Sequence, residues 1–223
     1  MNIVADIPTE MRSESVSFET FRRWALSDEF PETGRYDFIR GRLVVDVEPE
    51  SLFSHNALKC EIAATLSDFL KDDDLLTTIG VRVTMPMCEL SVQPDIAVTT
   101  SQSFKDGRVT LTPHPTRADD AIEIVGPPDL VVEIISDSSV TKDSQDLCRL
   151  YFDAGVREYW LIDARGEDIS FRLLTRGEQG WEEVPVESQG FRASLILERS
   201  FRLDRQAGRR GEWRYDLLEA GHS

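Results

Sequence analysis

The clearest pattern along the chain is an apolar run over residues 130–135, with turn-forming residues on both sides. Such a run, rich in β-branched side chains, is typical of a strand that is buried on both faces of a sheet. Glu133 interrupts it. A buried carboxylate needs a cation, a hydrogen-bond donor or a raised pKa, because leaving it ionised and unpaired is costly. Either Glu133 pairs with a nearby Arg or faces a solvated strand end, or it is a functional carboxylate, and we favour the functional interpretation.

A helix and a second buried strand follow this run. Residues 143–154 have helical periodicity that turns Leu147, Leu150 and Tyr151 inward, and Gly155 is placed to end the helix. Residues 158–163 form the second apolar run. The order strand, helix, strand favours a right-handed crossover and a parallel strand pair.

The remaining pattern predicts shorter elements on both sides of this unit. Helices are predicted over residues 17–26, with Ser17 as the cap, and over residues 55–70. Strands are predicted over residues 36–45 as a hairpin, 79–85, 91–99, 169–175 and 181–186 as a second hairpin, 194–197 and 213–217. Residues 101–128 are rich in proline and predict a long connection, in which residues 121–125 form a strand or merely pack.

Charge limits the classes of partner. The net charge of −16 argues against a general nucleic-acid coat, because phosphate binding draws on clustered Lys and Arg. Residues 1–164 hold 15 basic and 30 acidic residues, whereas residues 165–223 hold 10 Arg and 11 acidic residues. An Arg-bearing face of the C-terminal part could still meet a phosphate backbone, although a solvated surface with ion pairs is the simpler interpretation.

Features of export and membrane insertion are missing from the sequence. No apolar run approaches the roughly 20 residues that a membrane-spanning helix needs, and the first residues lack a basic segment followed by an apolar one. The three cysteines are widely separated and predict reduced thiols. We therefore expect a cytoplasmic protein.

Candidate chemistry lies in two carboxylates that accompany predicted strands. Asp95 follows Pro94 within an apolar stretch, and Glu133 lies in the central run. Neighbouring strands can hold two such carboxylates a few ångströms apart, and Mg²⁺ or Mn²⁺ favours oxygen ligands while keeping several waters. The pair is compatible with a metal site, although many soluble proteins carry two such acids with no metal between them.

Several motifs occur in a fixed order along the chain. They are residues 36–43, His55 at the start of the following helix, Pro94-Asp95, residues 132–136, Asp143, Tyr151 and residues 154–163. Together they make residues 18–175 resemble the Uma-type family of putative restriction endonucleases, within the PD-(D/E)xK nuclease superfamily. The last block and its spacing from Glu133 are the most specific part.

The resemblance implies a restriction-endonuclease-like α/β core, with a mixed central sheet flanked by helices. We expect a loose arm over residues 1–16, this core over residues 17–190, and a C-terminal β extension packed on it over residues 191–223. The implied activity is metal-dependent hydrolysis of nucleic-acid phosphodiester bonds, with DNA as the expected substrate. A homodimer would allow both strands to be cut.

The resemblance also implies roles for single residues. Asp95 and Glu133 would bind Mg²⁺ or Mn²⁺ and take part in catalysis, with Asp37 and Asp143 as supporting acids. His55 would either cap its helix or help to position the substrate.

One position departs from the family pattern. The superfamily's lysine lies two residues after the second acid, where this chain has Ile135, and the Uma-type family carries it four residues after the Asp that matches Asp143, where this chain has Leu147. A leucine can neither donate to a phosphate nor orient water. Lys142 and Arg149 are the candidate replacements, and we favour Lys142 because it lies close to the strand end. Each also has a simpler interpretation, as a solvated cap-region residue and a surface ion pair.

Two alternatives to an active nuclease therefore stay open. The first is a catalytically impaired nuclease-fold protein that acts as a binding or regulatory module. The second is an interaction domain in which Asp95 and Glu133 make only internal ion pairs.

Overall fold

The structure, a computed structural model, describes residues 7–12, 15–31, 33–46, 50–70, 75–136 and 143–221. Its strands are β1 (Arg35–Ile39), β2 (Arg42–Asp46), β3 (Leu75–Ile79), β4 (Arg82–Met85), β5 (Leu90–Val92), β6 (Ile96–Thr100), β7 (Thr110–Pro113), β8 (Ala121–Val125), β9 (Leu130–Ile134), β10 (Glu158–Asp163), β11 (Ser170–Arg176), β12 (Trp181–Glu183), β13 (Arg192–Ser194), β14 (Arg199–Ala207) and β15 (Trp213–Glu219). Its helices are α1 (Phe18–Ala25), α2 (Ala57–Leu70), α3 (Ser101–Lys105) and α4 (Asp143–Ala154). Helical turns lie at Thr9–Arg12, Leu52–Asn56 (η3), Pro86–Cys88 and Ser188–Gly190.

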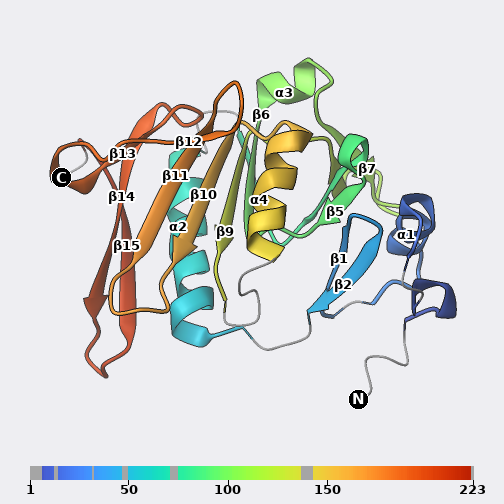
Figure 1. Cartoon of the computed structure of the whole chain (residues 1–223), viewed down its shortest axis with the longest axis horizontal. Helices are drawn as coiled ribbons and strands as arrows, with labels where there is room; N and C mark the ends of the chain where they lie inside the picture. Colours follow the sequence, from blue (N-terminus) through green and yellow to red (C-terminus); the bar gives the residue numbers. More distant parts are fainter. Residues whose placement is uncertain are drawn as a thin grey trace.

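Within these residues the strands form three sheets. Two six-stranded sheets have the orders β2-β1-β5-β4-β8-β7 and β12-β11-β10-β9-β6-β3, and β13-β14-β15 forms a third. The second sheet is mixed: β9 pairs in parallel with β10 and antiparallel with β6. The expected strand, helix, strand crossover is therefore confirmed, with α4 as its helix (Figure 1).

Both faces of the second sheet are covered by helices, with α4 in front of it and α2 behind it (Figure 1). Because successive side chains of a strand point to opposite faces, alternate residues of β9 join different clusters. Val132 packs with Leu58 and Ile62 of α2, whereas Val131 packs with Tyr151 of α4. Each such side chain stabilises the fold by about 1.5–3 kcal/mol on burial. This double burial explains the continuous apolar run in the sequence.

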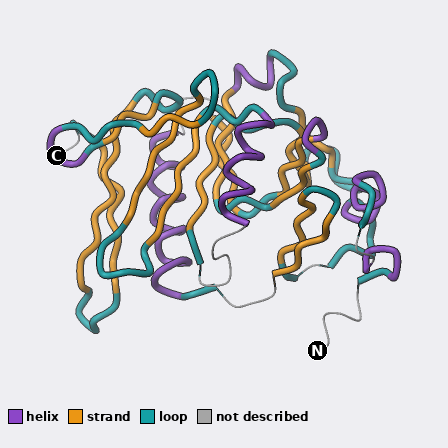
Figure 2. Tube along the Cα trace, viewed as in Figure 1, coloured by secondary structure: helices purple, strands orange, loops and turns teal. Residues whose placement is uncertain are grey.

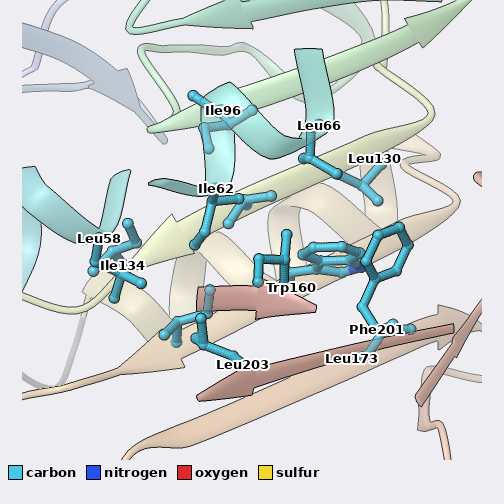
Figure 3. Close-up of a cluster of buried hydrophobic side chains, with 14 of the residues drawn as sticks. Leu58, Ile62, Leu66, Ile96, Leu130, Ile134, Trp160, Leu173, Phe201 and Leu203 are labelled. Atoms are coloured by element: carbon cyan, nitrogen blue, oxygen red, sulfur yellow. The ribbon is translucent and has the colours of Figure 1, made fainter. Parts of the chain in front are cut away.

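The C-terminal strands pack against the same core. Phe201 of β14 contacts Trp160 of β10, with ring centroids 5.2 Å apart (Figure 3). Leu217 of β15 belongs to the buried cluster of α2, and its backbone N–H donates to Glu61 Oε1 at 3.3 Å. Helix α2 thus packs against both the second and the third sheet, and Figure 2 shows helices and strands in the same view as Figure 1. The division into an arm, a core and an extension stays a prediction.

The N-terminal elements form a separate aromatic cluster. Ser17 caps α1 by accepting a hydrogen bond from Thr20 N at 3.1 Å, as the sequence predicted. Phe21 of α1 lies on Phe38 of β1, with centroids 5.2 Å apart. Met11 is also buried here. Met11 and Val16, which lie at the end of the expected arm, help to cover α1 and the hairpin.

Two predicted strands are each divided in the structure. Residues 91–99 were expected to be one strand, but β5 ends at Val92 and β6 begins at Ile96 in a different sheet. The intervening Pro94 has no N–H for a sheet ladder. Residues 79–85 are likewise divided, because Gly80 adopts a φ of +59° between β3 and β4.

The expected connection over residues 101–128 is largely ordered as α3, β7 and β8. Helix α3 is capped by Thr100, whose hydroxyl accepts from Ser103 N at 3.2 Å. In the C-terminal part, Leu195 and Leu197 lie in a turn, and the nine-residue β14 was not predicted. Its buried Phe201 and Leu203 alternate with charged residues, which weakened the apolar signal. No helix in the described part of the chain is long and apolar enough to span a membrane.

Candidate active site

Asp95 and Glu133 meet where β6 begins and β9 ends. The antiparallel register pairs Ile96 with Val132, so one further step places Asp95 opposite Glu133. The backbone N–H of Ile134 donates to Asp95 Oδ2 at 2.8 Å and fixes that carboxylate on the neighbouring strand. Both acids are buried, with 3% and 9% of their surface exposed. Sheet pairing therefore brings together two carboxylates that lie 38 residues apart in the sequence.

The helical turn η3 and the start of α2 supply a second set of groups around Asp95. His55 Nε2 lies 3.3 Å from Asp95 Oδ2, and Lys59 Nζ lies 3.6 Å from Asp95 Oδ1. Residues four apart on a helix share a face, which explains why His55 and Lys59 approach the same carboxylate. Glu50 completes the set, because its carboxylate pairs with Lys59 Nζ at 2.5 Å and lies 3.4 Å from His55 Nδ1.

Groups from α4 and the first sheet surround Glu133. Tyr151 OH donates to Glu133 Oε1 at 2.7 Å, and Arg35 Nη2 lies 3.8 Å from the same oxygen. Arg35 is in turn held by Asp37, whose Oδ2 accepts from Arg35 Nε at 2.7 Å. Asp37 Oδ1 accepts from the backbone N–H of Gln93 at 2.9 Å. Asp37 thus positions a guanidinium beside Glu133.

The two central carboxylates have opposite pKa shifts. Burial raises the pKa of Glu133 to about 7; the negative charge of Asp95 adds to this rise, while Arg35 and Tyr151 oppose it. Burial also acts to raise the pKa of Asp95, but the hydrogen bond and charge of His55, the charge of Arg35 and the N–H of Ile134 together lower it. Paired carboxylates with pKa values pushed apart can take different roles, one ionised and one exchanging a proton near neutral pH.

The pKa of His55 is raised as well. Its burial disfavours the imidazolium, but the hydrogen bond to Asp95 and the charges of Asp95 and Glu50 outweigh that effect. A positive His55 and a negative Asp95 stabilise each other. The His55 side chain therefore pairs with the carboxylate of Asp95 in the structure.

The residues at this end of the sheet fit a divalent cation. Glu50, His55 and Asp95 each offer a ligand atom, and these atoms lie within 4.8 Å of one another. His55 Nδ1 is buried and has no hydrogen-bond partner, since its contact with Glu50 lacks hydrogen-bond geometry. Two carboxylates and an imidazole are ligands that Mn²⁺ and related ions accept. Asp95 therefore belongs to two adjoining ligand sets, one with Glu133 and one with Glu50 and His55.

Leu147, at the position where the resemblance implies a lysine, lies in an apolar environment. Leu147 has 9% of its surface exposed and packs in the cluster of Val131 and Tyr151. Arg149 lies on the solvent-facing side of α4, where it pairs with Asp153 at 3.7 Å. This is the surface ion pair that the sequence left open for Arg149, and a supporting role of Arg149 at the site stays a prediction. Lys142 lies outside the described residues, and Asp143 begins α4 with a side chain that the structure does not describe.

Sequence reasoning missed Glu50, Lys59 and Arg35. A weak signal existed for two of them, because Lys59 follows His55 at helical spacing and Arg35 precedes Asp37 by two positions on one strand. Glu50 lies in a loop, and its place in the site follows from tertiary folding alone.

A mixed sheet flanked by helices, with a buried acid pair where adjacent strands end, defines a restriction-endonuclease-like α/β fold. The chain belongs to the Uma2 family, described as "Putative restriction endonuclease", whose family model matches residues 18–206. The predicted resemblance and fold class are both confirmed.

One solved structure extends the comparison. It is the crystal structure of a "putative nuclease belonging to DUF820" from Anabaena variabilis ATCC 29413, with a TM-score of 0.61 and 18% sequence identity. The match covers 82% of this chain and 91% of that one. At this identity the likeness shows the fold. No curated protein matches the chain.

Proposed function

We propose that the protein is a metal-dependent endonuclease that hydrolyses nucleic-acid phosphodiester bonds, with DNA as its substrate. The observation that carries this proposal is the pair Asp95 and Glu133, buried on neighbouring strands and held by donors from Ile134 and Tyr151. Membership of a family described as restriction endonucleases supports it.

In this proposal, Mg²⁺ or Mn²⁺ would be held by Asp95 and Glu133 and would polarise the scissile phosphate and lower the pKa of a water molecule. Asp95 stays ionised through the support of His55 and Ile134. Glu133, with a pKa of about 7, exchanges a proton in the physiological range. Asp37 orients Arg35, and the guanidinium limits repulsion between the two carboxylates. Asp143 and Lys142 stay predicted contributors.

The same proposal includes the partners and the place of action. The protein has a net charge of −16, which repels the phosphates of a nucleic-acid duplex. Binding would therefore need basic side chains or bound metal ions close to the phosphates. A homodimer would present two sites to the two strands. We infer a cytoplasmic location, where DNA is accessible to such an enzyme.

One observation favours a second candidate function. Leu147 is packed in the core at the position where the family carries a lysine. A protein that kept the acids and lost the cation could bind metal and nucleic acid without cleaving. That protein would be a binding or regulatory module.

Nicking of supercoiled plasmid DNA in the presence of Mg²⁺ or Mn²⁺ separates the two functions. The matched control is Asp95→Asn, which keeps the size of the side chain and removes its charge. Metal-dependent nicking by the wild type and none by the variant supports the endonuclease. Mn²⁺ binding by calorimetry without any nicking supports the binding module, and absence of both refutes the metal site.

A further inference from the structure

The chain has four lysines, and of the two that lie in the described residues, one is at the candidate active site. Lys71 and Lys142 are outside the described residues, and Lys105 is exposed at the end of α3. Helix α3 follows β6 at Thr100, the end of the strand opposite to Asp95. Lys59, by contrast, has only 14% of its side chain exposed.

The contacts of Lys59 distinguish it from the other two cations at the site. Arg35 is anchored on Asp37 through Nε, and its pKa is raised well above the usual value because the surrounding carboxylates outweigh its burial. His55 lies on Asp95 Oδ2, the oxygen that also accepts from Ile134 N. Lys59 approaches the other oxygen, Oδ1, at 3.6 Å.

The chemistry of an ammonium suits this position. An ammonium is a compact charge with three donors on a flexible four-carbon stem. A guanidinium is planar, and in Arg35 its orientation is fixed by the hydrogen bond to Asp37. Lys59 comes from α2, on the opposite face of the sheet from Leu147 on α4. A cation at the acid pair therefore does not require α4.

We propose that Lys59 is the catalytic cation of this site, which rests on the proposed endonuclease function. Its ammonium offsets part of the negative charge of Glu50 and Asp95 in the metal-free protein and donates to the reacting phosphate during cleavage. In that hydrolysis the water oxygen bonds to phosphorus and the bond from phosphorus to the leaving strand's oxygen breaks. The water gives a proton to a base, the leaving oxygen takes one from solvent, and Lys59 keeps its own proton throughout.

If Lys59 has this role, its removal should change Mn²⁺ affinity and the rate of cleavage in opposite directions. An ammonium and a divalent ion compete for the same carboxylate oxygens, because like charges a few ångströms apart repel each other. Loss of the Lys59 charge should therefore tighten Mn²⁺ binding while it slows cleavage. A lysine that only holds Glu50 and Asp95 in place would behave differently, since its removal would release two ligands and weaken Mn²⁺ binding.

The test compares Lys59→Met with Lys142→Met and with Lys105→Met as the matched control, in the full chain. Lys59→Gln is a second variant in case the apolar side chain disturbs folding. Mn²⁺ affinity is measured by calorimetry, and nicking of supercoiled plasmid is measured on the same preparations. We expect Lys59→Met to bind Mn²⁺ about threefold tighter or more and to nick about 10²-fold more slowly. We expect Lys105→Met to match the wild type in both.

The wild type tests the proposed function, and the Lys59 variants test the role of Lys59. A wild type without metal-dependent nicking overturns the proposed function, and the catalytic role of Lys59 with it. In an active wild type, undiminished nicking by both Lys59 variants overturns the inference, as does weaker Mn²⁺ binding by both. Loss of nicking in Lys142→Met with normal nicking in Lys59→Met also overturns it and assigns the role to Lys142.

Discussion

The two ends of strand β9 carry buried acids in contrasting environments. Asp129, just before β9, accepts from Thr100 N at 2.8 Å, from Ser103 Oγ at 2.9 Å and from Arg157 Nη1 at 3.0 Å. Glu133, near the other end, accepts from Tyr151 at 2.7 Å, and its cation Arg35 stays 3.8 Å away. Asp129 is saturated by donors, whereas Glu133 is not.

Burial alone therefore does not mark a functional carboxylate in this fold. Glu158 of β10 makes the same point, because it is fully buried and accepts from Trp160 Nε1, Ser194 Oγ and Leu195 N. It fastens the C-terminal segment to the central sheet. Donor supply separates these structural acids from Glu133, which accepts from Tyr151 and has Arg35 as a more distant cation. Burial raises the pKa of Glu158 as well as that of Glu133, so a raised pKa alone does not mark the functional acid.

Among changes at the two ends of β9, Glu133→Gln is expected to have the largest effect. The variant keeps the hydrogen bond from Tyr151 but removes the charge that would hold the metal. We expect metal-dependent nicking to fall about 10³-fold, with circular dichroism and thermal melting unchanged or melting slightly raised. Nicking at the wild-type rate would remove Glu133 from the site.

The matching change at the other end of β9 is Asp129→Asn. It weakens several charge-assisted hydrogen bonds in a closed site, so we expect a loss of about 2–3 kcal/mol in the free energy of unfolding. Urea denaturation measures that loss, and calorimetry should give an unchanged Mn²⁺ affinity. A selective loss of Mn²⁺ binding in a stable Asp129 variant would contradict the distinction between the two ends.

The raised pKa of Glu133 predicts that Mn²⁺ binding depends on pH. Metal binding needs the ionised form of Glu133, so Mn²⁺ affinity should rise by up to about tenfold per pH unit below a pKa of about 7 and level off above it. Calorimetry between pH 5.5 and 8.5, roughly spanning that pKa, measures this profile. Glu133→Gln should show a flatter one.

Protein stability should move the opposite way with pH. The pKa of Glu133 is raised above its value of 4.5 in the absence of the fold, so the folded state holds a proton that the unfolded state releases. This contribution is complete below pH 4.5 and is lost as the pH rises through about 7. We expect the free energy of unfolding to fall by on the order of 2 kcal/mol across this window, and less in Glu133→Gln. A rise in wild-type stability over the same window, with no such rise in Glu133→Gln, would contradict the shift.

The smallest expected effect comes from Tyr151→Phe. Its hydroxyl lowers the pKa of Glu133 by donating to the carboxylate. Loss of that donor should move the midpoint of the Mn²⁺ profile up by about half a pH unit and cost about 1 kcal/mol of stability. An unshifted midpoint would mean that Tyr151 serves packing alone.

The sequence predicted the crossover of β9, α4 and β10 because both strands are continuous apolar runs and the helix has a clear inward stripe. It did not predict the division between β5 and β6, since one apolar stretch around Pro94 enters two different sheets and only the pairing partners reveal this. Strand β14 was missed because Arg and Asp occupy its exposed positions between Phe201 and Leu203.

Only part of the candidate site could be predicted from the sequence. Asp95 and Glu133 lie in recognisable motifs, and sheet register then brings them together. Glu50, Lys59 and Arg35 reach them from other elements, and long-range folding sets those approaches rather than any local pattern. The position of the family lysine could be located in the sequence, but a replacement cation on α2 could not.

In the proposed function, Asp95 lies at the centre of a divalent metal site beside Glu133. A crystal of the wild type soaked in Mn²⁺, with anomalous diffraction recorded near the manganese edge, tests it directly. We expect an anomalous peak within coordination distance of Asp95 that Asp95→Asn abolishes. A peak at another site, or none at Asp95 in crystals that diffract well, would contradict it.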